Sequence, residues 1–447
     1  MPPITACNVA VIGGGAAGLA AARHLRREGH SVVVFEKESE VGGIWVYTNN
    51  TEPDPIGVDP TRPIVHSSLY ASLRTNLPRE VMGFREYPFT AKKTGQRDPR
   101  RFPGHKEVFE YLKDYASEFG ISELVRFETE VSRVWRSGSG KWEVRFRNRN
   151  EEKEEGFDAV VVCNGHYTEP RIAHIPGVDW WPGKQIHSHN YRVPEPFENK
   201  TVVLIGSSAS AVDISREIAS VAKEVHIASW SNSNEENATL PGYHNVWLRP
   251  MIESANEDGT ISFPQGFKIS ADIILHCTGY KYHFPFLDTE GIVTVDDNRV
   301  GPLYKHVFPP SLAPWLSFVG VPWKVAPFPQ FELQCEWIAG ILSGRISLPS
   351  EKEMMKDVEA FYDSLQASGV PKRYTHNLTG YQFEYNDWIA TQCGFPKTEE
   401  WRKKIYHATS LNRKARPENY REEWEDEDLV LQAYKDIARQ ISCKQAT

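Results

Sequence analysis

The sequence predicts an α/β fold with two Rossmann-like dinucleotide-binding domains, the second inserted in the first. Two glycine-rich turns, at residues 13–18 and 206–211, each follow a short apolar strand and each open a helix. The chain has 447 residues, of which 40% are hydrophobic, so it can build two cores. We expect residues 1–168 to form the first part of one domain, 169–284 the inserted domain, and 285–447 the return to the first domain with a C-terminal helical cap.

The first turn has the pattern Gly13-x-Gly15-x-x-Gly18 and lies between the strand NVAVI and a helix rich in Ala, Leu and Arg. Gly13 permits the tight turn, Gly15 lets the backbone approach a pyrophosphate, and Gly18 lets the helix meet the strand. The helix N-terminus adds partial positive charge. Gly29 is placed to end this helix, and SVVVFEKE is the next strand.

Glu36 closes that second strand, 23 residues after Gly13. A carboxylate at this position accepts hydrogen bonds from ribose hydroxyls and repels a 2′-phosphate. The first site therefore suits FAD or NAD and not NADP. The alternative is a glycine turn followed by a surface Glu, without a ligand.

The second turn is Gly206-x-Ser208-x-x-Ala211, and Ser229 follows Gly206 by the same 23 residues. A hydroxyl there removes the repulsion, so the second site favours NADPH. The predicted contacts are Gly206, Ser208, Ser210, Ser229, Trp230 and Ser231. Because two glycines are replaced, the motif is weak alone, and a degenerate unit that binds nothing is the alternative.

The remaining predicted elements follow from periodicity and turn residues. They are helices at 105–120 and 210–222, a strand pair within 125–146, strands at 157–165, 201–206, 224–229 and 271–280, and a tail helix with apolar residues at 354, 358, 361 and 365. Residues 42–105 are rich in proline and aromatic residues and show little periodicity. A stretch of this kind inside a domain is usually functional, and we expect it to cover the first cofactor.

Composition excludes several classes of protein. The net charge of −8 comes from interspersed charges, so nucleic-acid binding is not expected. The six cysteines are scattered, which predicts a reducing compartment and no metal site. Neither a signal peptide nor an apolar run of membrane-spanning length is visible, so we expect a cytoplasmic protein that does not bind membranes. A homodimer is compatible with these features.

Five further motifs carry a family resemblance. The segment WPGKQIHSHNY, residues 181–191, matches a linker fingerprint through its Gly, His and Tyr, with Trp181 replacing the usual Phe. The other motifs are GGIW at 42–45, LRTN at 73–76, CNGHY at 163–167 and CTGY at 277–280. With them the chain resembles the flavin-containing monooxygenases, and most of all their plant S-oxygenase branch. That branch usually carries Arg where this chain has Trp230.

The resemblance implies FAD and NADPH as cofactors, with O2 and a thioether as substrates. NADPH would reduce FAD, O2 would add to give a C4a-hydroperoxyflavin, and thioether sulfur would take the distal oxygen to become a sulfoxide. It places Asn76 near the flavin, where its amide would donate to the hydroperoxide or hold the nicotinamide end; without the resemblance, an Asn before Leu-Pro is a turn residue. It also places Gly43 and Trp45 along the flavin, with a core position as the alternative for Trp45, and Gly320 and Gln334 beneath the isoalloxazine. His187 and Tyr191 are expected to fix the linker geometry and not to act as acid and base.

Several alternatives compete with S-oxygenation. A Baeyer–Villiger monooxygenase and an auxin-synthesis flavin monooxygenase share the linker, and a non-catalytic flavoprotein could sense NADP(H) or serve as a scaffold. A disulfide reductase is excluded because VGGIWVY, residues 41–47, holds no cysteine pair. The identity of the sulfide, the stereochemistry of the sulfoxide and the oligomeric state are left open.

Overall fold

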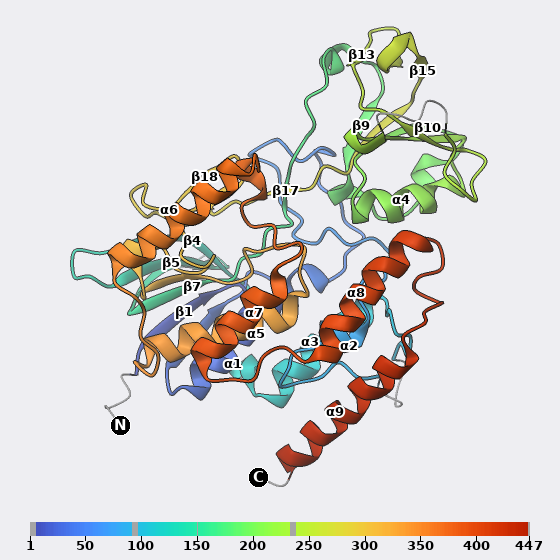
Figure 1. Cartoon of the computed structure of the whole chain (residues 1–447). Helices are drawn as coiled ribbons and strands as arrows, with labels where there is room; N and C mark the ends of the chain where they lie inside the picture. Colours follow the sequence, from blue (N-terminus) through green and yellow to red (C-terminus); the bar gives the residue numbers. More distant parts are fainter. Residues whose placement is uncertain (1–5, 92–96, 150, 233–237, 446–447) are drawn as a thin grey trace. The chain divides into compact units, whose positions relative to one another are not determined.

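The computed structural model describes residues 6–91, 97–149, 151–232 and 238–445. The chain divides into two units, each with its own core (Figure 1). Unit 1 comprises residues 1–46, 74–165 and 282–447, and unit 2 comprises residues 47–73 and 166–281. The unit borders near 165 and 281 lie close to the predicted ones, but the segment 47–73 joins unit 2, which the sequence did not suggest.

Unit 1 contains a five-stranded parallel sheet in the order β20-β7-β1-β2-β3. Its strands are β1 (Asn8–Ile12), β2 (Ser31–Phe35), β3 (Val125–Arg126), β7 (Ala159–Val162) and β20 (Leu316–Phe318). These strands are almost continuous apolar runs, as is typical of a parallel sheet covered on both faces. The strand start at Asn8 and the helix end before Gly29, which has φ +89°, are confirmed.

Alternate residues of β1 point to two different cores. Val9 and Val11 face helices α1 (Ala16–Arg27), α3 (His105–Glu118) and α5 (Pro327–Leu342). Ala10 and Ile12 face an antiparallel sheet of β4 (Thr129–Arg136), β5 (Trp142–Asn148) and β6 (Glu151–Phe157). The predicted strand pair corresponds to β4 and β5, whereas the charged strand β6 was not predicted.

Unit 2 repeats this plan with the sheet order β12-β11-β10-β16-β9, again parallel. Its strands are β9 (Lys184–His187), β10 (Thr201–Ile205), β11 (Glu224–Ala228), β12 (Val246–Arg249) and β16 (Ile273–His276). Helix α4 (Ala209–Ala219) packs on one face. The other face packs near the antiparallel strands β13 (Ser254–Ala255), β14 (Thr260–Ser262) and β15 (Lys268–Ser270).

The tail of the chain adds helices to unit 1, coloured orange to red in Figure 1. They are α6 (Glu351–Ala367), α7 (Gln382–Cys393), α8 (Glu400–Ala415) and α9 (Glu427–Gln445). The predicted tail helix is α6, which begins at a capping box between Ser350 and Glu353 and buries Met354 and Val358. Helices α8 and α9 share a small apolar cluster with Val81 of the short helix α2 (Arg79–Met82).

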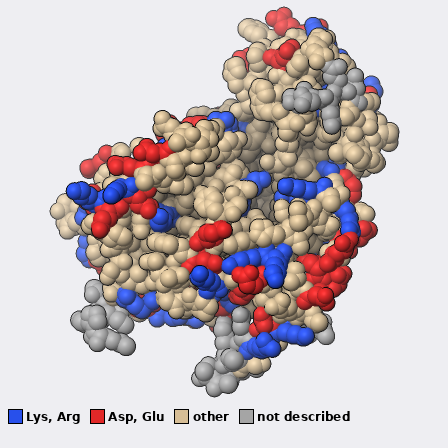
Figure 2. Space-filling view, viewed as in Figure 1, with Lys and Arg blue, Asp and Glu red and all other residues tan. Residues whose placement is uncertain are grey.

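The remaining strands are two-residue and three-residue pieces: β8 (Glu169–Pro170), β17 (Tyr280–Lys281), β18 (Thr294–Asp296) and β19 (Arg299–Gly301). Among the described residues, no helix is both long and apolar enough to cross a membrane. On the face shown in Figure 2, basic and acidic side chains of unit 1 lie interspersed, apart from an acidic group at the right-hand edge.

Candidate functional site

The first glycine turn fits its predicted backbone roles. Gly13 has φ +107°, and a Cβ built on it would lie 2.6 Å from the carbonyl oxygen of Cys163, at the end of β7. A Cβ on Gly18 would lie 1.8 Å from the carbonyl oxygen of Gly13. Only glycine at these two positions allows the turn to pass under β7 and the helix to start against the strand.

Gly15 is different, because the protein leaves space beside it. It is the N-cap of α1 in an extended conformation, with φ −77° and ψ −172°. The nearest atom to a Cβ on Gly15 would be the Cα of Gly43, at 3.5 Å, an ordinary contact. The turn therefore presents open backbone at the positive end of α1, which is the cradle that a pyrophosphate requires.

Glu36 lies at the end of β2 and is 5% exposed. Its carboxylate accepts hydrogen bonds from the backbone N–H of Gly14 at 2.7 Å and of Glu38 at 2.9 Å. Burial raises the pKa of Glu36 from its ordinary value. The carboxylate thus ties the second strand to the glycine turn, a structural role in addition to the predicted hydrogen bonds with a ribose.

The second turn repeats this geometry in unit 2. Gly206 has φ +123°, and its Cβ would lie 2.5 Å from the carbonyl oxygen of Cys277. Ser208 is the N-cap of α4 with φ −88° and ψ −173°, so a serine fits the conformation that Gly15 adopts. Ser208 is exposed, Ser210 is half-buried, and Ala211 is buried at the helix-to-strand contact. The turn can therefore receive a second pyrophosphate.

The residues after β11 offer hydroxyl groups where β2 offers a carboxylate. The Oγ atoms of Ser229 and Ser231 lie 2.8 Å apart, and the backbone N–H of Ser231 donates to Ser229 Oγ at 3.2 Å. Trp230 is 82% exposed. No acidic side chain occupies the position aligned with Glu36, so the geometry is compatible with a 2′-phosphate.

The linker residues have structural roles. His187 Nδ1 accepts from the backbone N–H of His189 at 3.0 Å, so Nε2 carries the proton and donates to the carbonyl of Gly279 at 3.0 Å. Burial lowers the pKa of His187 to about 3. Tyr191 is buried against Tyr70, with ring centroids 5.5 Å apart. These findings support a neutral, structural His187.

Trp181, which stands where the fingerprint has Phe, packs directly against Gly183 of the same motif. A Cβ on Gly183 would lie 2.2 Å from the indole ring of Trp181, so the ring covers the glycine. Glycine at 183 is therefore required by the packing of the larger aromatic side chain.

Gly320 and Gln334 are in direct contact. Gln334 is fully buried, and its Oε1 accepts from the Gly320 N–H at 2.9 Å while its Nε2 donates to the Tyr385 hydroxyl at 2.7 Å. Gly320 has φ +80°, which favours glycine. Gln334 therefore holds the Gly320 turn, and this side chain has no exposed surface for a cofactor.

Asn76 is half-buried in the loop that precedes α2. The next residue, Leu77, packs against the core cluster that includes Trp45 and Phe328. The Trp45 and Phe328 rings meet edge to face, with centroids 6.3 Å apart. Among the described residues no hydrogen bond involves the Asn76 side chain, so its amide can serve a ligand.

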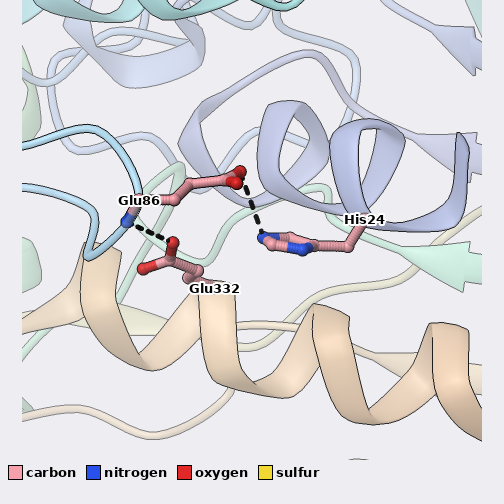
Figure 3. Close-up of side chains that lie close together, drawn as sticks. All are labelled: His24, Glu86 and Glu332. Atoms are coloured by element: carbon pink, nitrogen blue, oxygen red, sulfur yellow. Dashed lines mark hydrogen bonds and ion pairs between the residues drawn. The ribbon is translucent and has the colours of Figure 1, made fainter. Parts of the chain in front are cut away.

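Sequence reasoning missed a buried ionic cluster in unit 1 (Figure 3). His24 of α1 lies with its Nε2 3.7 Å from Glu86, and Glu332 of α5 accepts from the backbone N–H groups of Arg85 and Glu86. The pKa of Glu332 is raised to about 8, mainly by burial and further by the negative charges of Glu86 and Glu336.

The ligand atoms of His24, Glu86 and Glu332 lie close enough to suit a metal ion. However, Arg23 already pairs with Glu86 at 3.1 Å, and Arg27 lies 3.5 Å from the same carboxylate. Two guanidinium groups on one ligand oppose a divalent cation. The cluster instead connects α1, α5 and the 85–86 loop.

A surface hollow in unit 2 lies at the wrong edge of the sheet to be the dinucleotide site. It is lined by Pro182, Gly183, Lys184, Ile186, Pro196, Phe197, Lys200, Ala271, Asp272 and Ile273. Lys184, Thr201 and Ile273 begin β9, β10 and β16, whereas ligands of parallel sheets bind at the carboxyl ends of the strands.

Two Rossmann-type units, each with an open turn at a helix N-terminus, define a protein that binds two dinucleotides. Residues 6–239 and 232–397 match the family model described as flavin-binding monooxygenase-like. The chain therefore belongs to this family of monooxygenases, whose members use FAD and NADPH. It is an oxidoreductase, as the resemblance implied.

Individual relatives cover nearly the whole chain. The chain is 60% identical over 445 residues to flavin-containing monooxygenase FMO GS-OX-like 4 from Arabidopsis thaliana, covering 98% of each. It is 60% identical to S-allyl-L-cysteine S-oxygenase from Allium sativum, with a TM-score of 0.96, covering 98% of this chain and 100% of that one. This TM-score confirms the predicted α/β fold class. The contacts of single residues with FAD, NADPH and substrate stay predictions.

Proposed function

We propose that this protein is an FAD- and NADPH-dependent S-oxygenase that converts a thioether to a sulfoxide. The observation that carries the proposal is its 60% identity, over nearly the full length of both chains, to a protein named S-allyl-L-cysteine S-oxygenase. Thioether sulfur is a soft nucleophile, which a flavin-activated oxygen can oxidise without an acid–base pair on the protein. A cytoplasmic location is part of this proposal.

FAD would bind to the first turn and NADPH to the second. Gly13, Gly15 and Gly18 would bring the pyrophosphate of FAD to the N-terminus of α1, with Glu36 at the ribose and Gly43 and Trp45 along the flavin. The cradle at Gly15 supports this assignment, because a Cβ there would point into space that no protein atom fills closer than 3.5 Å.

NADPH would lie on Gly206, Ser208 and Ser210, with its 2′-phosphate near Ser229, Trp230 and Ser231. The paired hydroxyl groups of Ser229 and Ser231 support this placement, since they lie 2.8 Å apart and can both turn toward an anion. Flavin, when bound and reduced, supplies the chemistry with O2, and the protein orients it and excludes water.

Asn76 is the residue that we assign to catalysis. Its amide would donate a hydrogen bond to the oxygen that is transferred, and no described intramolecular bond competes for it. Gly320 and Gln334 would support the flavin indirectly, because Gln334 fixes the Gly320 turn at 2.9 Å.

A thioether panel tests the proposal. The purified yellow protein is given NADPH and O2 with S-allyl-L-cysteine, a methylthioalkyl glucosinolate, a cyclic ketone or indole-3-pyruvate, and products are identified by mass. Sulfoxide from one of the two thioethers is expected. An ester or lactone from the ketone, indole acetate from the pyruvate, or a yellow protein that never oxidises NADPH would each contradict it.

A further inference from the structure

The loop that carries Asn76 is held by backbone hydrogen bonds at both of its ends. At its start, the backbone N–H of Thr75 donates to the carbonyl of Pro103 at 2.9 Å. At its end, the N–H of Arg79 donates to the carbonyl of Arg101 at 3.0 Å. The three residues from Asn76 to Pro78 lie between these anchors, so the direction of the Asn76 amide depends on how firmly each anchor holds.

The C-terminal cap also binds the start of this loop, through the side chain of Arg421. Arg421 Nε donates to the carbonyl of Thr75 at 3.0 Å, and one of its terminal nitrogens lies 3.4 Å from the carbonyl of Arg74. The peptide groups on both sides of Thr75 are therefore bonded. Hydrogen bonds from a guanidinium to carbonyl oxygens are charge-assisted, and a planar guanidinium can hold two neighbouring acceptors together.

Arg421 is itself held in place by its neighbours. Its guanidinium lies over the ring of Tyr420, 4.8 Å from the centroid, and Tyr420 is buried edge to face against Phe102, with centroids 5.7 Å apart. Nearby, Arg101 makes a buried bidentate pair with Asp426 at 2.6 and 2.9 Å. The segment 420–426 is thus bonded to residues 101–102, the same stretch that anchors the loop from its other side.

We propose that Arg421 is a positioning residue for the oxygenation, which sets the direction of the Asn76 amide through the carbonyls of Arg74 and Thr75. This inference rests on the proposed function of Asn76. It gives the C-terminal cap a role in coupling NADPH consumption to product formation, although the cap lies more than 300 residues further along the chain.

The test compares four full-length, FAD-loaded proteins: wild type, Arg421→Met, Asn76→Ala and the double variant. Sulfoxide and H2O2 are measured per NADPH consumed with S-allyl-L-cysteine and O2. For Arg421→Met we expect the ratio of sulfoxide to H2O2 to fall about tenfold, which corresponds to about 1.4 kcal/mol at the transition state. FAD content and the KM for NADPH should stay unchanged.

Two further comparisons separate positioning from general destabilisation. Arg421→Lys retains one donor and should recover most of the coupling. Arg416→Met is the matched control. Arg416 lies at the C-terminal end of α8, close in sequence to Arg421, and among the described residues its side chain forms ion pairs with Glu423 and Glu425 and no bond to residues 74–75. This variant should behave as wild type. If Arg421 acts through Asn76, the double variant should be no more uncoupled than Asn76→Ala alone.

The outcomes are distinguishable. A tightly coupled Arg421→Met beside an uncoupled Asn76→Ala would overturn this inference and leave the proposed function intact. The inference would also be overturned if the two substitutions lowered the ratio of sulfoxide to H2O2 additively in the double variant. The same holds if Arg421→Lys lost FAD and had a lower melting temperature. A tightly coupled Asn76→Ala would remove the catalytic assignment on which the inference rests, and a wild type that forms no sulfoxide would overturn the proposed function itself.

Discussion

Gly15 and Gly43 lie against one another, so closely that a Cβ built on Gly43 would be 2.9 Å from the Gly15 Cα. The loop after β2 therefore reaches the turn before α1. Gly43 has φ +56°, which also favours glycine. This contact explains in physical terms why the GGIW motif and the first glycine turn occur in one site.

Gly15→Val should yield a folded protein with little FAD. The backbone conformation of Gly15 suits a side chain, but the valine would fill the space where a pyrophosphate approaches. Absorbance at 450 nm relative to 280 nm reports FAD, and the melting temperature reports folding. Gly138→Val is the control, since Gly138 has no atom within 4 Å of its Cβ position. Stoichiometric FAD in Gly15→Val would place the first cofactor elsewhere.

Asn76→Ala should uncouple the enzyme. Loss of a positioned donor of this kind typically costs about 2.7–4 kcal/mol. We expect NADPH oxidation to continue, with H2O2 as its main product and little sulfoxide. If the variant forms sulfoxide as efficiently as wild type, Asn76 is a turn residue.

Trp230→Arg should lower the KM for NADPH about tenfold, because new charge-assisted bonds contribute on the order of 1.5–3 kcal/mol and part of this is lost to solvent. Trp230 is 82% exposed, so little packing is lost in the exchange. The KM for NADH should not change. Trp180→Arg is the matched control, because Trp180 also lies in unit 2 and is 73% exposed. It should not change the KM for NADPH. Equal gains for NADH and NADPH would reject this placement of the phosphate.

The free energy of unfolding should fall as the pH rises, because the buried Glu332 carboxyl group loses its proton. Its pKa is raised from 4.5 to about 8 in the folded protein. Between these values the folded state binds more protons than the unfolded state, so the free energy of unfolding falls with pH, by at most about 1.4 kcal/mol per unit. Above about pH 8 the contribution is lost and the slope levels off.

Glu332→Gln should flatten this dependence, because the amide cannot ionise. Melting temperatures of the two proteins between pH 5 and 9 provide the measurement, and Glu384→Gln, at an exposed position of α7, is the control. A variant whose melting temperature falls with pH as steeply as that of wild type would show that Glu332 is not the titrating group.

The sequence predicted what depends on local pattern and could not predict what depends on distant contacts. Gly13 and Gly206 were recognised by the strand and helix around them, and both lie under the carbonyl of a cysteine that ends a neighbouring strand. Strand β6 was missed because its residues are mostly charged. They form a solvent-facing strand in which Glu154 pairs with Arg145 of β5, at 2.6 Å.

The buried ionic cluster had no sequence signal, because His24, Glu86 and Glu332 come from distant parts of the chain and meet only in the folded protein. The same is true of Arg421 and Thr75. Likewise, the segment 47–73 shows no periodicity that would assign it to unit 2. It joins that unit through buried polar contacts, among them the hydrogen bond that the Glu52 N–H donates to Asn190 Oδ1 at 2.9 Å.

Isotope labelling shows whether the protein transfers one oxygen atom from O2 to a thioether. The reaction is run with NADPH, S-allyl-L-cysteine and ¹⁸O2 in ordinary water, and the sulfoxide is analysed by mass. We expect one ¹⁸O atom in each sulfoxide molecule and one sulfoxide per NADPH consumed. Unlabelled sulfoxide, or NADPH oxidation that yields H2O2 and no sulfoxide, would contradict the proposed function.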